Sequence, residues 1–204
     1  IKRSEFIGHI KRVSTVEEAR AYIESVRKTY HDARHVCSAF IIGADRDIQR
    51  SSDDGEPAGT AGVPMMQALL ARQTREDGTT DLSDVVAVVV RYFGGIKLGA
   101  GGLVRAYTDS VVQTLDGALF DSRERLRVGK VPSSHADAGR LENEIRAAGL
   151  NVLGTEYGAE GATISLGVFD RPEELARAEE LVVSLSSGAA SVTWGDTQWV
   201  DLPV

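Results

Sequence analysis

The strongest strand pattern in the chain is VVAVVV at residues 85–90. It lacks the alternation of polar and apolar residues that a half-exposed strand shows, so it predicts a strand buried on both faces. A polar loop at 73–83 precedes it, and a glycine-rich segment at 91–102 leads from it into a helix that ends near Gly117. The chain is therefore expected to cover both faces of a sheet.

The residues before this strand alternate between helix and strand patterns. Thr15, with Glu18 three residues later, forms a capping box that predicts a helix over about 16–30. The apolar run VCSAFIIG at 36–43 predicts a second buried strand. Pro64 suits the first turn of another helix. The first half therefore mixes helices and strands.

The pattern changes after Asp121. Strands are expected at about 123–130, 150–157, 162–169 and 190–200, with helices that end at Gly149 and Gly188. The resulting order, βαββαβ, is that of a ferredoxin-like sandwich. We therefore predict an α+β protein with two domains, at 1–122 and 123–204.

Composition limits the class of protein. The 204 residues contain 42% hydrophobic and 26% charged side chains, as ordinary globular chains do. No window approaches the roughly 18 uninterrupted apolar residues of a membrane span, and no export signal is visible. Because Cys37 is the single cysteine, we expect a reduced, cytoplasmic protein without an internal disulfide.

The net charge of −7 argues against a protein that coats nucleic acid non-specifically. However, the acidic excess is unequally divided. Residues 1–122 carry 15 basic and 17 acidic side chains, whereas residues 123–204 carry 8 and 13. A local basic patch in the first domain is therefore compatible with the composition.

Glycine is concentrated in two segments, with three of the 21 glycines at 55–62 and five at 94–102. In the second segment a strand, a turn and a helix N-terminus would present backbone N–H groups and a positive helix dipole, which favour an anion. The same glycines could instead only bend a buried strand into a packed helix, and the spacing matches neither the dinucleotide fingerprint nor the P-loop. The candidate contacts to RNA or phosphate are Arg91, Gly94, Gly95, Lys97, Gly99, Gly101, Gly102 and Arg105.

Three acidic residues, Asp53, Asp54 and Glu56, lie beside the first glycine cluster. Such a run could hold a divalent cation through oxygen ligands or supply a general base. Ser-Asp-Asp-Gly-Glu-Pro is also typical turn composition, and we favour that structural role. No metal, cofactor or catalytic residue is predicted.

Two further groups are weaker candidates. His35 and Cys37 would share a strand face, but a buried free cysteine usually packs as a small hydrophobe. Arg123, Arg125 and Arg127 alternate along one expected strand and could meet RNA phosphates, although a solvated face is the more common use of such residues.

Three segments of the first half together resemble the YigZ/IMPACT family. They are HVCSAFIIG at 35–43, SDDGEPAGTAGVP at 52–64 and VVAVVVRYFGGIKLGAGGLVRAY at 85–107, in the family's order and separation. The resemblance implies a first domain with the α+β fold of a ribosomal protein domain, elongation factor G domain IV and the GHMP small-molecule kinases. In its βαββαβ pattern the second half is similar to bacterial two-domain members, which implies a ferredoxin-like domain resembling elongation factor G domain V.

The resemblance also implies a role associated with translation. We expect a cytoplasmic, non-enzymatic regulatory protein that binds RNA or a ribosomal site through its glycine-rich, basic-flanked surface. The alternative is an enzyme acting on a nucleotide or small phosphorylated metabolite, with 94–102 as phosphate cradle and the acidic run as base or metal ligand. A protein-interaction module is a third hypothesis. No membrane partner is expected, and the sequence does not define an oligomeric state.

Overall fold

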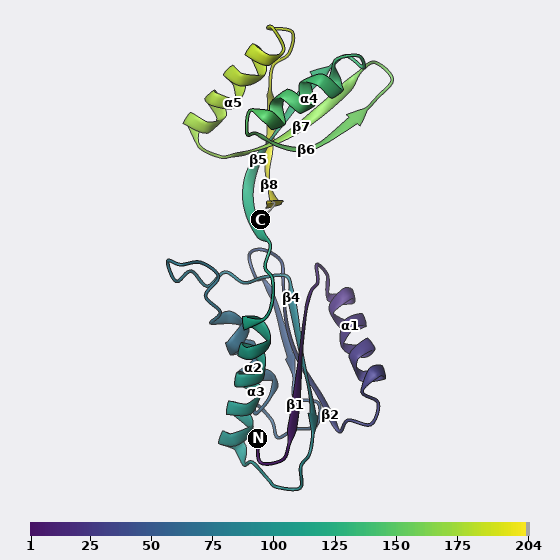
Figure 1. The fold of residues 1–204 in the computed structure, drawn as a ribbon, viewed down its shortest axis with the longest axis vertical. Coiled ribbons are helices and arrows are strands. Elements are labelled where there is room, and N and C mark those ends of the chain that lie inside the picture. Colours follow the sequence, from purple (N-terminus) through teal and green to yellow (C-terminus); the bar gives the residue numbers. More distant parts are fainter. Residues whose placement is uncertain (203–204) are drawn as a thin grey trace. The chain divides into compact units, whose positions relative to one another are not determined.

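The VVAVVV run lies in β4 (Val85–Tyr92), an inner strand of an antiparallel four-stranded sheet ordered β1-β4-β2-β3. The other strands are β1 (Glu5–Arg12), β2 (His35–Ile42) and β3 (Ile48–Ser52). The computed structural model describes residues 1–202. The sheet belongs to the first of two compact units, which divide between Phe120 and Asp121 (Figure 1).

Helices cover both faces of this sheet, as the apolar run predicts (Figure 1). α1 (Val16–Thr29) lies on one face, and α2 (Gly62–Leu70) and α3 (Ala100–Asp116) lie on the other. The odd-numbered residues of 85–90 pack in the core with α2 and α3, and the even-numbered ones pack in the core with α1. The prediction of a strand buried on both faces is therefore confirmed.

The first helix has the predicted cap. The hydroxyl of Thr15 accepts the backbone N–H of Glu18 at 3.1 Å. The carboxylate of Glu18 in turn accepts the backbone N–H of Ser14 at 2.7 Å. Two N–H groups that the helix itself cannot satisfy are thus paired by the capping side chains.

The two outer strands of the first sheet, β1 and β3, have no strong sequence pattern. All five side chains of β3 are exposed, so the strand shows no apolar alternation. β1 pairs with β4 along its whole length, from Glu5 opposite Tyr92 to Arg12 opposite Val85. These strands complete the sheet beside the two strands that the sequence predicts.

The second unit has the predicted order βαββαβ. Its elements are β5 (Ser122–Ser133), α4 (Ala138–Ala147), β6 (Asn151–Tyr157), β7 (Ala162–Phe169), α5 (Pro172–Leu185) and β8 (Thr193–Leu202). The strands form one antiparallel sheet ordered β6-β7-β5-β8, with a core that includes Leu141, Ile164 and Val182. The α+β class is confirmed. Within residues 1–202, the helices fall short of the length and apolar character that a bilayer crossing requires.

Candidate functional site

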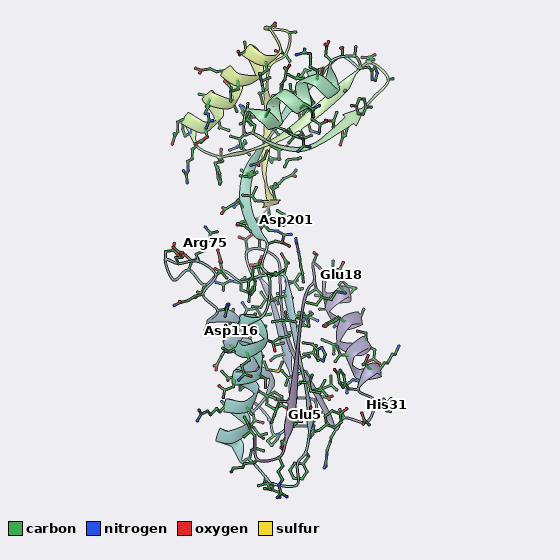
Figure 2. All side chains as sticks on the ribbon, viewed as in Figure 1. Glu5, Glu18, His31, Arg75, Asp116 and Asp201 are labelled. Carbon is green, nitrogen blue, oxygen red and sulfur yellow. The ribbon has the colours of Figure 1, made fainter. Side chains whose placement is uncertain are left out.

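The two glycine-rich segments lie at the same end of the first sheet. β2 begins at this end. Its residue His35 pairs with Arg91 of β4, where the second segment begins. Its residue Ser38 pairs with Ser52 of β3, and the first segment follows Ser52. Both α2 and α3 also begin here. Figure 2 shows Glu5 and His31 at this end of the unit. Residues that are about 40 positions apart in the chain are therefore brought to one edge of the fold.

The carboxylate of Asp53 caps α2. It accepts backbone N–H groups from Gly59 at 2.8 Å, Ala61 at 3.0 Å and Gly62 at 2.8 Å. Burial pushes the pKa of Asp53 upward, but the three N–H bonds outweigh that effect and hold its pKa below the ordinary value. The negative charge therefore stabilises the loop and the start of the helix.

Asp54 fixes the same loop to α1 and β2. Its carboxylate accepts two bonds from the Arg27 guanidinium, at 2.8 and 3.1 Å, and the backbone N–H of Val36 at 2.7 Å. Burial raises the pKa of Asp54, and the bonds from Arg27 and Val36 more than offset this, so the pKa is lowered. This bidentate geometry is the strongest form of an arginine–carboxylate contact.

Glu56 lies at the centre of a buried polar cluster. Its Oε1 accepts a bond from Arg91 at 2.5 Å and from the Tyr107 hydroxyl at 2.8 Å, and His35 Nε2 lies 4.0 Å from Oε2. The Cys37 thiol lies 3.3 Å from the Tyr107 hydroxyl. Burial raises the pKa of Cys37 to about 12 and also raises the pKa of Tyr107. Within the cluster, the buried charge of Glu56 is paired with that of Arg91.

All three acidic side chains of the run therefore have internal partners, which favours the structural role over the metal or base hypothesis. Among residues 1–202, no three or more His, Cys, Asp or Glu side chains are grouped so that they could hold a metal ion. The sequence reasoning missed His35 and Tyr107 as members of the cluster. Tyr107 lies within the helix expected before Gly117, and its partner Glu56 is 51 residues away in the sequence, so no local pattern links the two.

The three basic candidates differ in exposure. Arg91 is only 5% exposed and is paired with Glu56, so the expectation that it contacts phosphate does not fit its position. Lys97 is exposed and has no ion-pair partner within the part of the chain that the structure describes. The Arg105 side chain is 83% exposed and lies 3.5 Å from Asp109. Lys97 and Arg105 are therefore the cations that this turn presents to solvent.

The glycines of the second segment serve two different purposes. A Cβ atom on Gly94 would lie 2.0 Å from the backbone carbon of Arg3, so this glycine permits close packing of the chain start. Gly99, at φ 76°, is the N-cap of α3, and no side chain caps that helix. A Cβ on Gly95, Gly99 or Gly101 would meet nothing within 4 Å. Gly102 is also closely packed, because its Cβ would lie 3.0 Å from that of Leu98. Close packing thus explains Gly94 and Gly102, whereas Gly95, Gly99 and Gly101 face open space.

Two apolar side chains on the same turn escaped the sequence reasoning. Phe93 is 47% exposed and Ile96 is 44% exposed, although both belong to the segment 91–102. The sequence signal that could have indicated this surface is the position of Phe93, next to glycines and close to Lys97. The exposed parts of this turn form what we call the turn surface: Phe93, Gly95, Ile96, Lys97, Gly99, Gly101 and Arg105.

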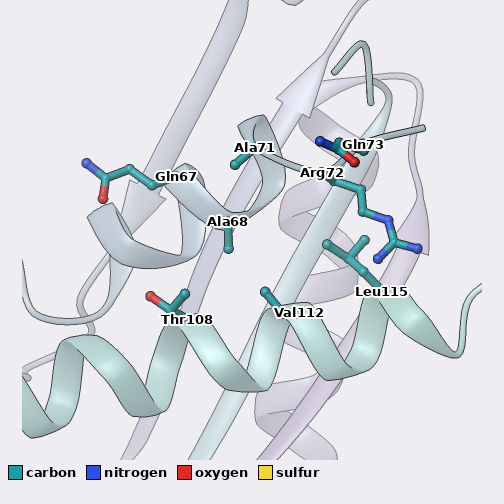
Figure 3. Close-up of a pocket in the computed structure, with 8 residues that line it drawn as sticks. All are labelled: Gln67, Ala68, Ala71, Arg72, Gln73, Thr108, Val112 and Leu115. Carbon is teal, nitrogen blue, oxygen red and sulfur yellow. The ribbon is translucent and has the colours of Figure 1, made fainter. Parts of the chain in front are cut away.

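A separate groove lies between α2 and α3 (Figure 3). It has a volume of about 570 Å³. Its lining comprises Gln67, Ala68, Ala71, Arg72, Gln73, Thr108, Val112 and Leu115. The charged lining residue, Arg72, is paired with Asp116 at 2.5 Å. The groove follows the second halves of the two helices and does not include the turn surface, which lies where α3 begins.

Two known family models match the sequence of this chain. Residues 2–115 match the Impact N-terminal domain, and residues 134–189 match a domain of unknown function, DUF1949. The protein is thus of the two-domain α+β class that joins these modules. The chain belongs to the IMPACT family.

Individual relatives support this membership. "IMPACT family member YvyE" of Bacillus subtilis is 36% identical over 204 residues, which cover all of this chain and 89% of the relative. "IMPACT family member YigZ" of Escherichia coli is 49% identical over 117 residues, 56% of this chain and 53% of the relative. A crystal structure of a hypothetical protein matches with a TM-score of 0.64 at 32% identity, covering 94% of this chain and 89% of that one.

Proposed function

We propose that this protein acts in translation-related regulation and binds RNA or a ribosomal site through the turn surface. The observation that carries the proposal is the N-terminus of α3, which no side chain caps, beside three glycines that face open space and Lys97, which has no ion-pair partner among residues 1–202. Backbone N–H groups at a helix start, a favourable dipole and a nearby cation together suit a phosphate group. Membership of the IMPACT family supports the broader role.

The charge around the turn surface supports the same proposal despite the net charge of −7. Lys2 and Arg3 are exposed and belong to the chain start against which Gly94 packs. Arg34, also exposed, immediately precedes β2 at the same sheet end. The carboxylates of the acidic run are engaged by Arg27, Arg91 and backbone N–H groups. The exposed carboxylates at this sheet end are Glu5, opposite Tyr92, and Asp32, which accepts the Tyr92 hydroxyl.

The enzyme hypothesis is less well supported. It needs a general base or a metal ligand from the acidic run beside the phosphate cradle. Asp53 and Asp54 are held as ionised hydrogen-bond acceptors for structural donors, and Glu56 is buried in its pair with Arg91. A base must reach the proton that it removes, and these three carboxylates are directed to internal partners. Binding without catalysis therefore agrees better with the geometry.

The test compares wild-type full-length protein with a Lys97→Ala/Arg105→Ala variant in fluorescence anisotropy with a labelled single-stranded RNA at several salt concentrations. The variant should bind more weakly, and the slope of log K against log salt should fall by about 0.7 for each phosphate that is no longer neutralised. The matched control is Lys130→Ala/Arg177→Ala, which removes one exposed lysine and one exposed arginine from the second unit. Absence of salt-sensitive association of the wild type with both RNA and purified ribosomes would refute the proposal.

A further inference from the structure

We infer that Phe93 stacks on an unpaired nucleobase, so that the turn surface selects single-stranded RNA over double-stranded RNA. The inference rests on the proposed function and specifies its ligand. Its starting point is that an aromatic side chain directly follows β4 and is 47% exposed although it belongs to a well-packed domain.

The ring of Phe93 lies on a fixed support. The Arg91 guanidinium carbon is 5.6 Å from the centroid of the Phe93 ring and 5.5 Å from that of Phe6. Phe6 in turn makes an edge contact with Tyr107, at 5.3 Å between centroids. Glu56 holds Arg91 in place through the buried ion pair. A partly exposed ring supported in this way loses little conformational entropy when a ligand binds.

The support also affects the chemistry of the ring. A cation below an aromatic face attracts its electron density, and Arg91 is buried enough for this attraction to be little screened. The π-face of a nucleobase is available for stacking only where the base is not enclosed in a duplex. Stacking of this kind is worth roughly a 5- to 150-fold change in affinity per base and tolerates any base. Phe93 therefore suits an unpaired base of any sequence.

The groups around the ring complete a single-strand site. Ile96 is 44% exposed and offers a second apolar contact, while Lys97 and Arg105 supply charge for the neighbouring phosphates. A row of basic groups interleaved with an aromatic ring is the usual arrangement in proteins that bind single strands without sequence preference. In a duplex the bases are stacked and paired, so Phe93 and Ile96 would face the charged phosphate backbone and make no favourable apolar contact with it.

The test measures the affinity of the full-length protein for a labelled oligoadenylate of about 12 nucleotides, within the usual site size for single strands, and for a blunt RNA duplex of the same length. Anisotropy at several salt concentrations gives both affinities. A duplex has the higher charge density, so purely electrostatic binding would favour it. The variants are Phe93→Ala, Phe93→Leu, which keeps apolar bulk without a π-face, and Phe93→Tyr, which keeps the stack. The matched control is Phe169→Ala in the second unit, because Phe169 is 38% exposed and has Arg171 at the same 5.6 Å.

The expected result is that the wild type prefers the single strand and that Phe93→Ala and Phe93→Leu each lose roughly 5- to 150-fold in affinity for it. Their salt slopes should not change, and Phe93→Tyr and Phe169→Ala should bind like the wild type. Equal binding of both RNAs, or a Phe93→Leu variant indistinguishable from Phe169→Ala, overturns the inference and leaves the proposed function standing. If the wild type binds neither RNA nor ribosomes, both the inference and the proposed function fail.

Discussion

The carboxylate of Glu56 and the guanidinium of Arg91 form a buried ion pair that joins the two glycine-rich segments of the first unit. The two groups are 2.5 Å apart, and their side chains are only 3% and 6% exposed. Such a pair offsets the loss of hydration of both charges only while both partners are present. Arg91 also supports Phe93, so the pair connects the packing of the acidic loop with the geometry of the turn surface.

Glu56→Gln should therefore destabilise the first unit strongly. It leaves the charge of Arg91 buried without a counterion, and we expect the free energy of unfolding to fall by about 3–5 kcal/mol. Urea unfolding followed by far-UV circular dichroism measures this change. Both tryptophans, Trp194 and Trp199, lie in the second unit, so their fluorescence reports that unit separately.

The control for this prediction is Glu160→Gln, which removes one exposed carboxylate from the second unit. It should change the free energy of unfolding by less than about 0.5 kcal/mol, as exposed substitutions usually do. A Glu56→Gln variant as stable as this control would show that the ion pair does not stabilise the fold.

Acid should weaken the acidic loop over a defined pH range. The pKa values of Asp53 and Asp54 are lowered in the folded protein from the ordinary 3.8, so these groups stabilise the fold while they are ionised in both states. That contribution is complete well above about pH 4 and is lost as the pH falls below about 4 towards the folded-state pKa. Asp53→Asn should flatten the fall in stability in that range, as measured by urea unfolding at successive pH values. The exposed Asp47→Asn serves as the control, and an equal flattening there would contradict the prediction.

The parts of the fold that the sequence predicted are those set by local patterns. The run VVAVVV has no polar residue, so its sequence alone predicts a strand buried on both faces. The cap of α1 depends on Thr15 and Glu18, which are three residues apart. β3 was missed because an edge strand with exposed side chains has no apolar period. The glycine-rich turn was placed correctly between β4 and α3, although α3 already begins at Ala100, so Gly101 and Gly102 lie in the helix.

The position of Arg91 shows why the site was harder to predict. An arginine at the end of a strand and next to a glycine turn is usually exposed, since burying its charge is costly. Its burial depends on Glu56, which is 35 residues away in the sequence and is brought close to it by the pairing of β2 with β3 and β4. Long-range ion pairs of this kind leave no periodic signal, so residue spacing alone could not reveal the partner.

His9 should make the first unit less stable in mild acid. Burial lowers the pKa of His9 below 6.5, and its Nε2 is buried without a hydrogen-bond partner among the described residues, near the Tyr30 ring at 5.2 Å. Because the unfolded chain takes up the proton at the higher pH, stability should fall as the pH drops through about 6.5 towards the folded-state pKa. His9→Phe should remove this fall between about pH 7 and 5 in urea titrations. His31→Gln, at an exposed position, should leave it unchanged, and an identical profile for His9→Phe and the wild type would contradict the assignment.

Cys37 should be inert in the folded protein. Burial raises its pKa to about 12, and the thiol contacts the Asp53 carbonyl oxygen at 3.0 Å. Since the thiolate is the reactive species, alkylation by iodoacetamide at about pH 8 should be slower by about a thousandfold than in the urea-unfolded chain. Mass spectrometry follows the reaction without ambiguity because the sequence has one cysteine. Comparable rates in the two states would mean that the cluster around Glu56 opens readily.

Two glycine substitutions distinguish packing from ligand binding within the turn. Gly94→Ala places a Cβ 2.0 Å from the backbone of Arg3, so it should destabilise the first unit by more than about 1 kcal/mol, a value typical of overpacking. Gly101→Ala meets nothing within 4 Å and lies in α3, so it should stabilise the helix by up to about 1 kcal/mol. Urea unfolding gives both values. If RNA approaches the backbone of the turn surface, Gly101→Ala should nevertheless bind single-stranded RNA more weakly than the wild type, because the added methyl group occupies the space in front of that backbone. A more stable variant with unchanged RNA affinity would place the bound RNA elsewhere on the turn surface.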